Sequence, residues 1–468
     1  RRLLLPRRMF AAARANHWII LLFMLALLVP AKYSFEVSGL RLTMLRSLLL
    51  VTFIPTCVGV FSGRSGGVRA CDALIAVYAI WVVLALLVHH GTSQAIETGG
   101  IYLIESLGAY LIARSYIRDA KSFLAFVSLL VVIVAGFSIF TVPESITGRN
   151  LIQGFSHSSM ERRLGLSRAY GSLEHPILYG VFCSSAVAFA WLGLSVMDTN
   201  RTNRLTRTAL VTISTAMSVS SGALAGMLVQ YILIGWNWIT RNASRRWLAL
   251  TGLLGAFYVL IDLLSNRGPI RVALHYLTMS PATAYNRITV WNWGIEDVKR
   301  NPIFGIGLNP WTKPAWMHSD SMDNFWLVVM VRYGLPAFVC LALAILSIMF
   351  GAGRQKMPNR DLADLRKAWI VAMIGLAISA STVHLWNAIL VYFHFLIGAA
   401  VWILDPKALQ SGPTSGYRTA KREALGQARA VRGAPVSRPA TTEPPEQPDP
   451  PTRGASLGAG LSSSRRKP

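Results

Sequence analysis

Residues 122–141 read SFLAFVSLLVVIVAGFSIFT and contain no charged side chain, and Lys121 stands directly before them. An α-helix rises about 1.5 Å per residue, so an apolar run of about 20 residues matches the hydrocarbon thickness of a bilayer. Backbone polar groups have no water to bond with in lipid, and a helix satisfies them internally. This stretch therefore predicts a membrane-spanning helix.

The composition of the whole chain extends this prediction. Of its 468 residues 53% are hydrophobic and 14% are charged, whereas a soluble chain carries roughly 25% charged residues. The net charge of +25 is scattered in short clusters between apolar runs. A nucleic-acid-binding protein gathers such charge on one soluble domain, so no nucleic-acid partner is expected. The predicted fold class is an all-α integral membrane protein.

Further apolar stretches of spanning length bring the expected number of transmembrane helices to about twelve. They are 17–31, 45–62, 71–90, 100–116, 122–141, 176–196, 208–220, 223–239, 247–265, 323–351, 368–386 and 388–404.

Two of these predictions leave the local geometry open. The stretches 208–220 and 223–239 are short and meet at Ser220-Ser221-Gly222, which fits either a tight hairpin or one broken helix. The stretch 323–351 contains Gly334-Leu335-Pro336. Proline removes a backbone donor and breaks or kinks a helix, so a kink or turn is expected there.

The basic residues predict the orientation, because Lys and Arg concentrate in cytoplasmic loops. One assignment places the basic clusters that follow every second helix on the cytoplasmic side, together with those before residue 17. Both termini are then cytoplasmic. Residues 1–16 form a cytoplasmic segment, 17–404 the membrane domain, and 405–468 a tail whose Pro-, Gly- and Ser-rich composition predicts disorder and attraction to membrane lipid.

Two long loops, 142–175 and 266–322, remain on the outer side, where we expect short surface helices. The first contains Arg162, Arg163 and Arg168, against the positive-inside trend. Arg162 and Arg163 fit a solvated loop that contacts lipid headgroups, and Arg163 is also a candidate supporting residue. Arg168 precedes His175-Pro176, where a helix should start, and its guanidinium could grip phosphate in a fork geometry. His175 is a further supporting candidate.

The second outer loop contains a predicted amphipathic helix over 284–300, because apolar residues recur there at helical spacing. Interfacial anchoring explains its tryptophans. Arg287 lies in the first turn, where a positive charge opposes the helix dipole, and this favours an anionic partner for Arg287. The segment Gly305-Ile306-Gly307 is not a nucleotide-binding fingerprint, since no strand and helix flank it.

His318, Asp323 and Asn324 stand before the next apolar run. His318 and Asp323 are candidate general bases. Asp323 and Asn324 could also cap the helix that follows, and capping and catalysis are compatible. The spacing of the acids and the histidine matches no familiar metal-binding pattern, so no metal site is expected.

Glu105 lies inside a predicted transmembrane helix. An acid in lipid is costly and is either functional or hydrogen-bonded to a neighbouring helix, and the sequence leaves both readings open. If Glu105 is functional, a transporter or flippase becomes an alternative function, which the break near Ser220 would also fit.

Three motifs in this order resemble the family of O-antigen ligases and O-antigen polymerases of the bacterial envelope. They are Arg168-Ala169-Tyr170-Gly171-Ser172, then Arg287 to Trp291 with Asn301 to Gly307, then Asp323-Asn324 with Gly334-Leu335-Pro336-Ala337. The resemblance covers about 30–404.

The resemblance implies a glycosyltransferase of the bacterial inner membrane that acts at its periplasmic face without cofactor or metal. Its donor would be a glycan on polyprenyl diphosphate, bound by Arg168 and Arg287. Its acceptor would be another glycan (polymerase) or lipid A core (ligase), and a chain-length regulator or flippase is a candidate partner. Ligases carry a catalytic His where Asp323 stands here, which favours a polymerase of O-antigen or exopolysaccharide with inverting chemistry.

Overall fold

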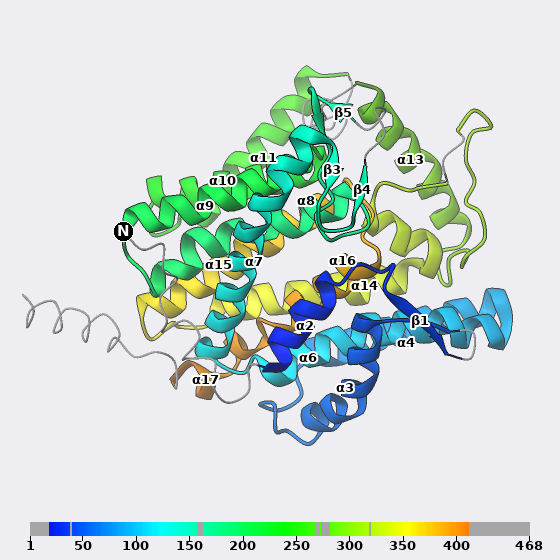
Figure 1. Cartoon of the computed structure of the whole chain (residues 1–468), viewed down its shortest axis with the longest axis horizontal. Helices are drawn as coiled ribbons and strands as arrows, with labels where there is room; N and C mark the ends of the chain where they lie inside the picture. Colours follow the sequence, from blue (N-terminus) through cyan, green and yellow to red (C-terminus); the bar gives the residue numbers. More distant parts are fainter. Residues whose placement is uncertain are drawn as a thin grey trace, which may run out of the picture. The chain divides into compact units, whose positions relative to one another are not determined.

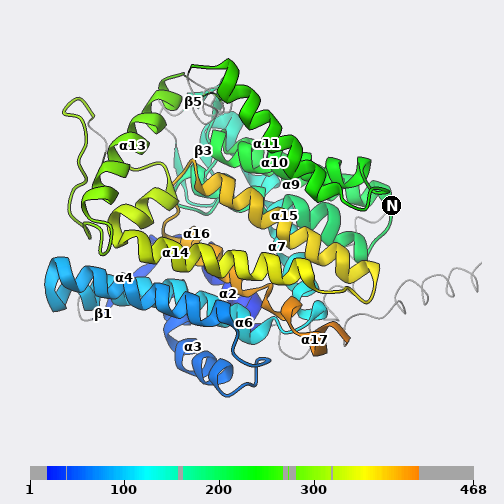
Figure 2. The same cartoon turned by 180° about the vertical axis from the view of Figure 1, so that it is seen from behind.

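The computed structural model describes residues 18–37, 40–156, 162–266, 272, 281–317 and 320–410, all within one compact unit, Arg1–Tyr417. The predicted cytoplasmic segment 1–16, the candidate base His318 and the tail from 411 onward lie outside the described residues. Figure 1 and Figure 2 show the helices from opposite sides.

Every one of the predicted apolar stretches is helical. Among the described residues, eight helical runs are long and apolar enough to cross a membrane, which confirms the all-α membrane fold. They are Met44–Phe61 (α3), Ala70–Tyr116 (α4, Ala70–Gln94, to α6, Ala109–Tyr116), Ala120–Thr147 (α7), Pro176–Val196 (α8, Pro176–Ser185, with its continuation), Ser221–Ile239 (α10), Arg246–Leu264 (α11), Phe325–Arg354 (α14) and Asn387–Leu404 (α16, Asn387–Gly398, with η6, Val401–Leu404).

The remaining predicted stretches are helices that are shorter or more polar. They are Trp18–Leu28 (α2), Arg201–Met217 (α9) and Arg360–Ala380 (α15). In the run 70–116, the segment that joins α4 to α6 consists of Ala95–Gly99 (η1), Gly100–Leu103 (α5) and Ile104–Gly108 (η2). In the run 176–196, α8 continues through Phe189–Gly193 (η4) and Leu194–Val196 (η5).

The long run 70–116 is two helices folded against each other. Gly91 has φ 75° and ψ −177°, a conformation that only glycine adopts readily. The chain then returns beside α4, since a Cβ on Gly99 would lie 3.3 Å from the Cα of Val83. The separate predictions for 71–90 and 100–116 are therefore right.

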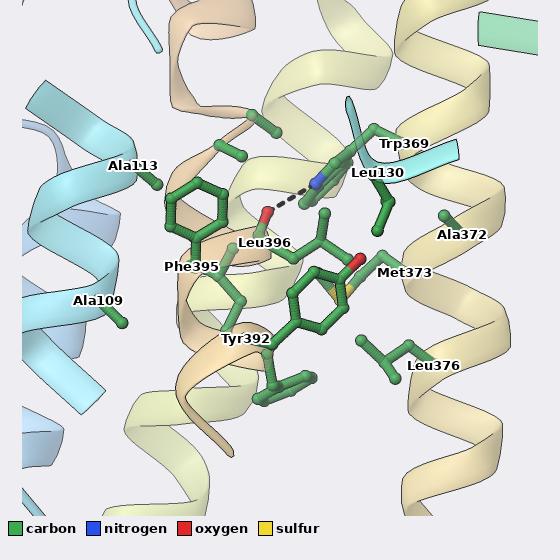
Figure 3. Close-up of a cluster of buried hydrophobic side chains, with 14 of the residues drawn as sticks. Ala109, Ala113, Leu130, Trp369, Ala372, Met373, Leu376, Tyr392, Phe395 and Leu396 are labelled. Carbon is green, nitrogen blue, oxygen red and sulfur yellow. Dashed lines mark hydrogen bonds between the residues drawn. The ribbon is translucent and has the colours of Figure 1, made fainter. Parts of the chain in front are cut away.

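Part of the hydrophobic core lies among α6, α7, α15 and α16 and is shown in Figure 3. Trp369 of α15 is fully buried, and its indole N–H donates to the carbonyl of Leu396 in α16 at 2.8 Å. Tyr392 shares a hydrogen bond of 2.8 Å with the hydroxyl of Ser185 in α8. Aromatic groups bury much apolar area, and their polar ends find partners, as buried Trp and Tyr require.

Large apolar side chains also cover the outside of the helices. Val51 of α3 is 75% exposed, and Leu263 of α11 is 78% exposed. None of the residues of α11 is buried. A water-soluble surface rarely exposes such contiguous apolar area, whereas lipid accommodates it.

The helices α9 and α10 form a tight hairpin rather than one broken helix. The hydroxyls of Thr212 in α9 and Tyr231 in α10 share a hydrogen bond across the pair, so the two helices lie side by side. The turn runs from Ser218 to Ser221, and Val219 within it has a positive φ of 43°. The sequence left this choice open, and the contact decides it.

The predicted interruption of α14 lies at Gly334, where φ is 82°. The segment 302–307 crosses the break. Its backbone N–H groups of Ile306 and Gly307 donate to the carbonyls of Val331 and Arg332 at 2.8 and 2.9 Å. A Cβ on Gly334 would lie 1.9 Å from the carbonyl oxygen of Ile303. The glycines of the last two motifs thus allow the backbone of the segment 302–307 to pack directly against the backbone of α14 at its break.

The first outer loop differs from the expectation of surface helices. α7 continues to Thr147, and the described part of the loop forms short antiparallel strand pairs. These are Arg149–Asn150 (β3) with Phe155–Ser156 (β4), and Arg162–Arg163 (β5) with Leu166–Ser167 (β6); Ser34–Val37 (β1) and Leu40–Thr43 (β2) form a further hairpin between α2 and α3.

The surface helix of the second outer loop is confirmed, as Pro281–Arg300 (α13), and it packs beside the first half of α14. The predicted start of the disordered tail at 405 is too early. Pro406–Gln410 (α17) is helical, with Ala408 and Leu409 buried. These two apolar side chains pack against the rest of the protein, which the Pro-, Gly- and Ser-rich composition of the tail as a whole did not indicate.

Candidate functional site

The turn between α9 and α10 brings together the two arginines that the sequence singled out. Arg168 donates from Nε to the carbonyl of Ser218 at 3.4 Å, and Arg287 donates from Nη2 to the hydroxyl of Ser221 at 3.2 Å. Both side chains are buried, with 9% exposure each. A charged guanidinium is rarely buried unless it meets partners.

Arg168 is positioned by the backbone on either side of it. The N–H of Ala169 donates to the carbonyl of Met217 at 2.9 Å, and the hydroxyl of Ser145 donates to the carbonyl of Ser167 at 2.7 Å. Gly171 has a positive φ of 57°, and a Cβ there would meet the ring of Tyr179 at 2.9 Å. The motif glycine is therefore needed for the loop to lie against α8.

A buried acid that the sequence reasoning missed, Glu144, organises the same loop. Its Oε1 accepts from the N–H of Tyr170 at 2.9 Å and from Nδ2 of Asn150 at 2.9 Å, and its Oε2 accepts from the N–H of Gly171 at 3.2 Å. Glu144 is 1% exposed. An acid beside Pro143, near the end of a long apolar run, is the signal that could have revealed it.

Arg287 projects from the first half of α13 into the same region. Its Nε is buried and has no hydrogen-bond partner among the residues that the structure describes. Burial lowers the pKa of Arg287, and the nearby Arg163 lowers it further, while Asp323 raises it. A buried donor without a partner is costly, which is consistent with a site built to receive an anion.

Asp323 lies within the electrostatic reach of all three arginines. Burial raises the pKa of Asp323, while Arg287, the hydroxyl of Ser321, Arg163 and Arg168 lower it. The Ser321 hydroxyl donates to Oδ1 of Asp323 at 3.2 Å. The predicted residues Arg168, Arg287, Arg163 and Asp323 therefore form one group, hereafter the arginine cluster.

Asn324 and His175 have structural roles. The side chain of Asn324 accepts from the N–H of Leu327 at 3.1 Å and caps α14. His175 caps α8, because its Nδ1 accepts from the N–H of Ile177 at 3.2 Å, and Pro176 begins that helix as predicted. Both expectations of helix starts are confirmed.

A further histidine, His384, lies close to the start of α14. The ring of His384 stacks against Phe325 with 6.3 Å between centroids, and the Phe325 N–H donates to the Val383 carbonyl at 3.1 Å. Burial, with Arg332 nearby, lowers the pKa of His384 to about 4. This imidazole is therefore neutral near pH 7 and a weak base.

Glu105 lies at a different cavity. Its Oε1 accepts from Nε of Arg46 in α3 at 2.7 Å. The second reading of this residue, a structural bond to a neighbouring helix, is the one that the geometry fits.

An apolar groove of about 860 Å³ lies along α14 and is lined by residues of α11, α13, α14 and α15. Ile288, next to Arg287, and Asn324, next to Asp323, line one end, and Met349 and Met373 lie further along. The lining residues of α14, from Asn324 to Met349, lie on both sides of its break at Gly334. Tyr258 and Asp262 of α11 form part of the opposite wall.

This arrangement can bind an anion and move a proton. Guanidinium groups hold phosphate oxygens in charge-assisted hydrogen bonds, and a half-buried carboxylate can accept a proton. Among the described residues, no group of three or more His, Cys, Asp or Glu side chains could hold a metal ion.

The fold and the arginine cluster define a multi-pass helical membrane protein with a cationic site at the ends of its helices. Residues 208–342 match the family model described as O-antigen ligase, which confirms the resemblance inferred from the motifs. The matched stretch contains the turn 218–221, α13 and the first half of α14. The match does not distinguish a ligase from a polymerase. No curated protein matches the chain.

Proposed function

We propose that this protein is an inverting glycosyltransferase that polymerises repeat units carried on polyprenyl diphosphate at the periplasmic face of the bacterial inner membrane. The arginine cluster supports this proposal most directly. Two buried guanidiniums from distant parts of the chain converge on one turn, and Nε of Arg287 has no hydrogen-bond partner within the described part of the chain. A diphosphate that links a lipid to a sugar carries two negative charges, and two guanidinium groups can each bind its phosphate oxygens with parallel N–H donors.

The groove beside the cluster supports a lipid-linked donor. An extended polyprenyl chain is a long apolar ligand, and the groove is lined mainly by apolar side chains next to Arg287. The diphosphate would lie at the cluster, and the hydrocarbon chain would follow α14 toward the other leaflet. Both parts of one ligand thereby find complementary surfaces.

The reaction needs a base and a stabilised leaving group. Asp323 would take the proton of the acceptor hydroxyl as that oxygen attacks the anomeric carbon of the donor. The bond from this carbon to the phosphate oxygen breaks, and polyprenyl diphosphate leaves with the electron pair. Arg168 and Arg287 stabilise the charge that develops there. Attack opposite to the leaving group inverts the anomeric configuration.

A ligase is the second candidate, since the matched family model carries that description. Its acceptor would be lipid A core instead of a second glycan. Asp323 in place of the histidine of ligases favours the polymerase. A transporter centred on Glu105 is less well supported, because Arg46 holds that carboxylate.

The test replaces Arg168 and Arg287 by Ala, and Glu105 by Gln, and measures the length and amount of surface polysaccharide. We expect the arginine variants to lose long chains. Single repeat units on lipid A core would indicate a polymerase, and long chains absent from lipid A core would indicate a ligase. The proposal fails if both arginine variants make normal polysaccharide while Glu105→Gln makes none.

A further inference from the structure

A second, smaller cavity of about 150 Å³ lies beside the loop that carries Arg168. Its polar lining comes from segments far apart in the chain: Arg41, Arg46, Glu105, Ser172, Glu174 and Asn387. In the orientation predicted from the basic loops, the segment around Arg41 and Arg46 is on the outer side. These two arginines thus also stand against the positive-inside trend.

An ion pair forms one wall of the cavity. Nε of Arg46 donates to Oε1 of Glu105 at 2.7 Å, and Nη1 of Arg46 donates to the Arg41 carbonyl at 3.0 Å. Glu105 is buried, with 7% exposure. The two charged groups are thereby fixed in place, and their orientation is set before a ligand arrives.

Glu174 and Asn387 form the exposed rim. The side-chain amide of Asn387 donates to Oε2 of Glu174, which joins the loop before α8 to the start of α16. Asn387 has a positive φ of 48°, a conformation that Asn tolerates better than most residues and that concentrates at functional sites. The ring of Trp386 lies 5.6 Å from that of His175.

The lining balances guanidinium donors against carboxylate acceptors. Two carboxylates would repel a diphosphate, and the four charged side chains disfavour a lipid chain, while alkyl side chains line much of the rest of the cavity. A ligand with many hydroxyl groups satisfies both kinds of partner, because each hydroxyl donates one hydrogen bond and accepts others. The volume is on the scale of one sugar ring.

One rigid loop connects this cavity with the arginine cluster. Arg168 lies at its start and Glu174 near its end. Between them, Gln153 donates from Nε2 to the carbonyls of Gly171 and Leu173 at 3.1 and 2.8 Å. Glu144 holds the N–H groups of Tyr170 and Gly171 from the other side. The loop can therefore fix the relative position of two ligands.

We propose that this cavity binds a sugar unit of the acceptor glycan. The inference rests on the proposed function and assigns its second substrate to a site distinct from the arginine cluster. Glu174, with Arg41, would select the acceptor by its hydroxyl groups, while the arginine cluster holds the donor.

The test uses the full-length protein in detergent and two independent variants. Glu174→Gln alters the polar rim, and Ala31→Trp fills the cavity from a lining residue whose own side chain is a methyl group. Val51→Trp on the lipid-facing side of α3 is the matched control for added bulk. The probes are the repeat-unit oligosaccharide, released by mild acid from the lipid-linked donor of the same cells, and polyprenyl diphosphate. Calorimetry measures the affinity for each.

We expect both cavity variants to bind the oligosaccharide about tenfold more weakly and to bind polyprenyl diphosphate as the wild type does, because the first variant loses a charge-assisted hydrogen bond and the second loses the volume of the sugar ring, each at this site only. In turnover, the KM for the acceptor should rise by a similar factor while kcat changes little. Wild-type affinity of both variants for the oligosaccharide, or an equal loss for polyprenyl diphosphate, overturns the inference. Failure of the proposed function looks different: Arg168→Lys and Arg287→Lys would then keep their affinity for polyprenyl diphosphate.

Discussion

Arg168 and Arg287 belong to loops far apart in the sequence and meet at one turn, where the first donates to the carbonyl of Ser218 and the second to the hydroxyl of Ser221. Their separation along the chain makes the turn between α9 and α10 the element that assembles the site. Both arginines act through the fixed geometry of their N–H donors as well as through their charge, so replacement by another cation tests each of them.

Replacing Arg168 or Arg287 by Lys should lower kcat/KM by about 100-fold, although the charge is kept. Lysine cannot offer two parallel N–H donors, and loss of one donor to developing charge typically costs about that much. A transfer assay with lipid-linked donor measures the effect. Arg162→Lys, on an exposed position of β5, is the control and should stay near the wild-type value. Equal activity of all three variants would contradict the prediction.

The pH dependence of the reaction should report Asp323. A carboxylate base works when ionised, so the rate is full above its pKa and falls as the pH drops through it. Burial raises this pKa, and Arg163 is one of the groups that lower it. Arg163→Gln should therefore raise the pKa of Asp323 further and move the acid limb of kcat/KM to higher pH, by up to about one unit.

Two further variants check this assignment. Asp323→Asn should reduce the rate by about 100-fold or more, because the proton acceptor is lost. Asp323→His should restore part of it with an acid limb nearer to the ordinary histidine pKa of about 6.5. An unchanged profile in Arg163→Gln together with an active Asp323→Asn would exclude Asp323 as the base.

Glu144 should be a positioning residue for Arg168. Glu144→Ala removes the acceptor of Tyr170 N–H, Gly171 N–H and Asn150 Nδ2, and leaving such buried donors unpaired costs about 2–4 kcal/mol in total. We expect a lower Tm in detergent and weaker binding of polyprenyl diphosphate. Ile139→Ala, at an exposed position of the same helix, serves as the control. Normal Tm and normal binding in Glu144→Ala would show that the loop is held by other contacts.

Gly334→Ala should prevent correct folding. The residue has φ 82°, and its Cβ would lie 1.9 Å from the backbone carbonyl of Ile303, which cannot move without displacing the segment 302–307. The yield of monodisperse protein and its Tm measure the effect. Gly235→Ala in α10 has open space around its Cβ and should be neutral or slightly stabilising, since Ala favours helix by up to about 1 kcal/mol. Similar yields for both variants would argue against an obligatory break.

The groove should be needed for the donor but not for folding. Ala342→Trp places a large ring among the lining residues of α14 and should raise the KM for the lipid-linked donor several-fold, because the hydrocarbon chain and the ring compete for the same volume. A water-soluble donor analogue with a short lipid should be affected less. If both donors respond equally, the groove does not hold the lipid chain.

The sequence by itself determined the helices. Lipid admits only internally bonded backbone, so apolar run length predicts each spanning stretch, and even the break near Gly334 was visible as Gly-Leu-Pro. It also marked Arg168 and Arg287, because Arg is unusual on a predicted outer loop, and Asp323 as a candidate general base beside a helix start. The hairpin between α9 and α10 remained open, since a local pattern cannot tell a tight turn from a broken helix.

The tertiary structure decided which of these residues share a site. It placed Ser218 and Ser221 between the two arginines, put the buried Glu144 under the first motif, and moved Glu105 to a second cavity with Arg46. Partners across long sequence separations depend on how helices pack, and packing is a property of complementary surfaces that no single segment encodes. The requirements of the bilayer thus specify which stretches form helices, and the contacts between helix ends specify which side chains form the arginine cluster.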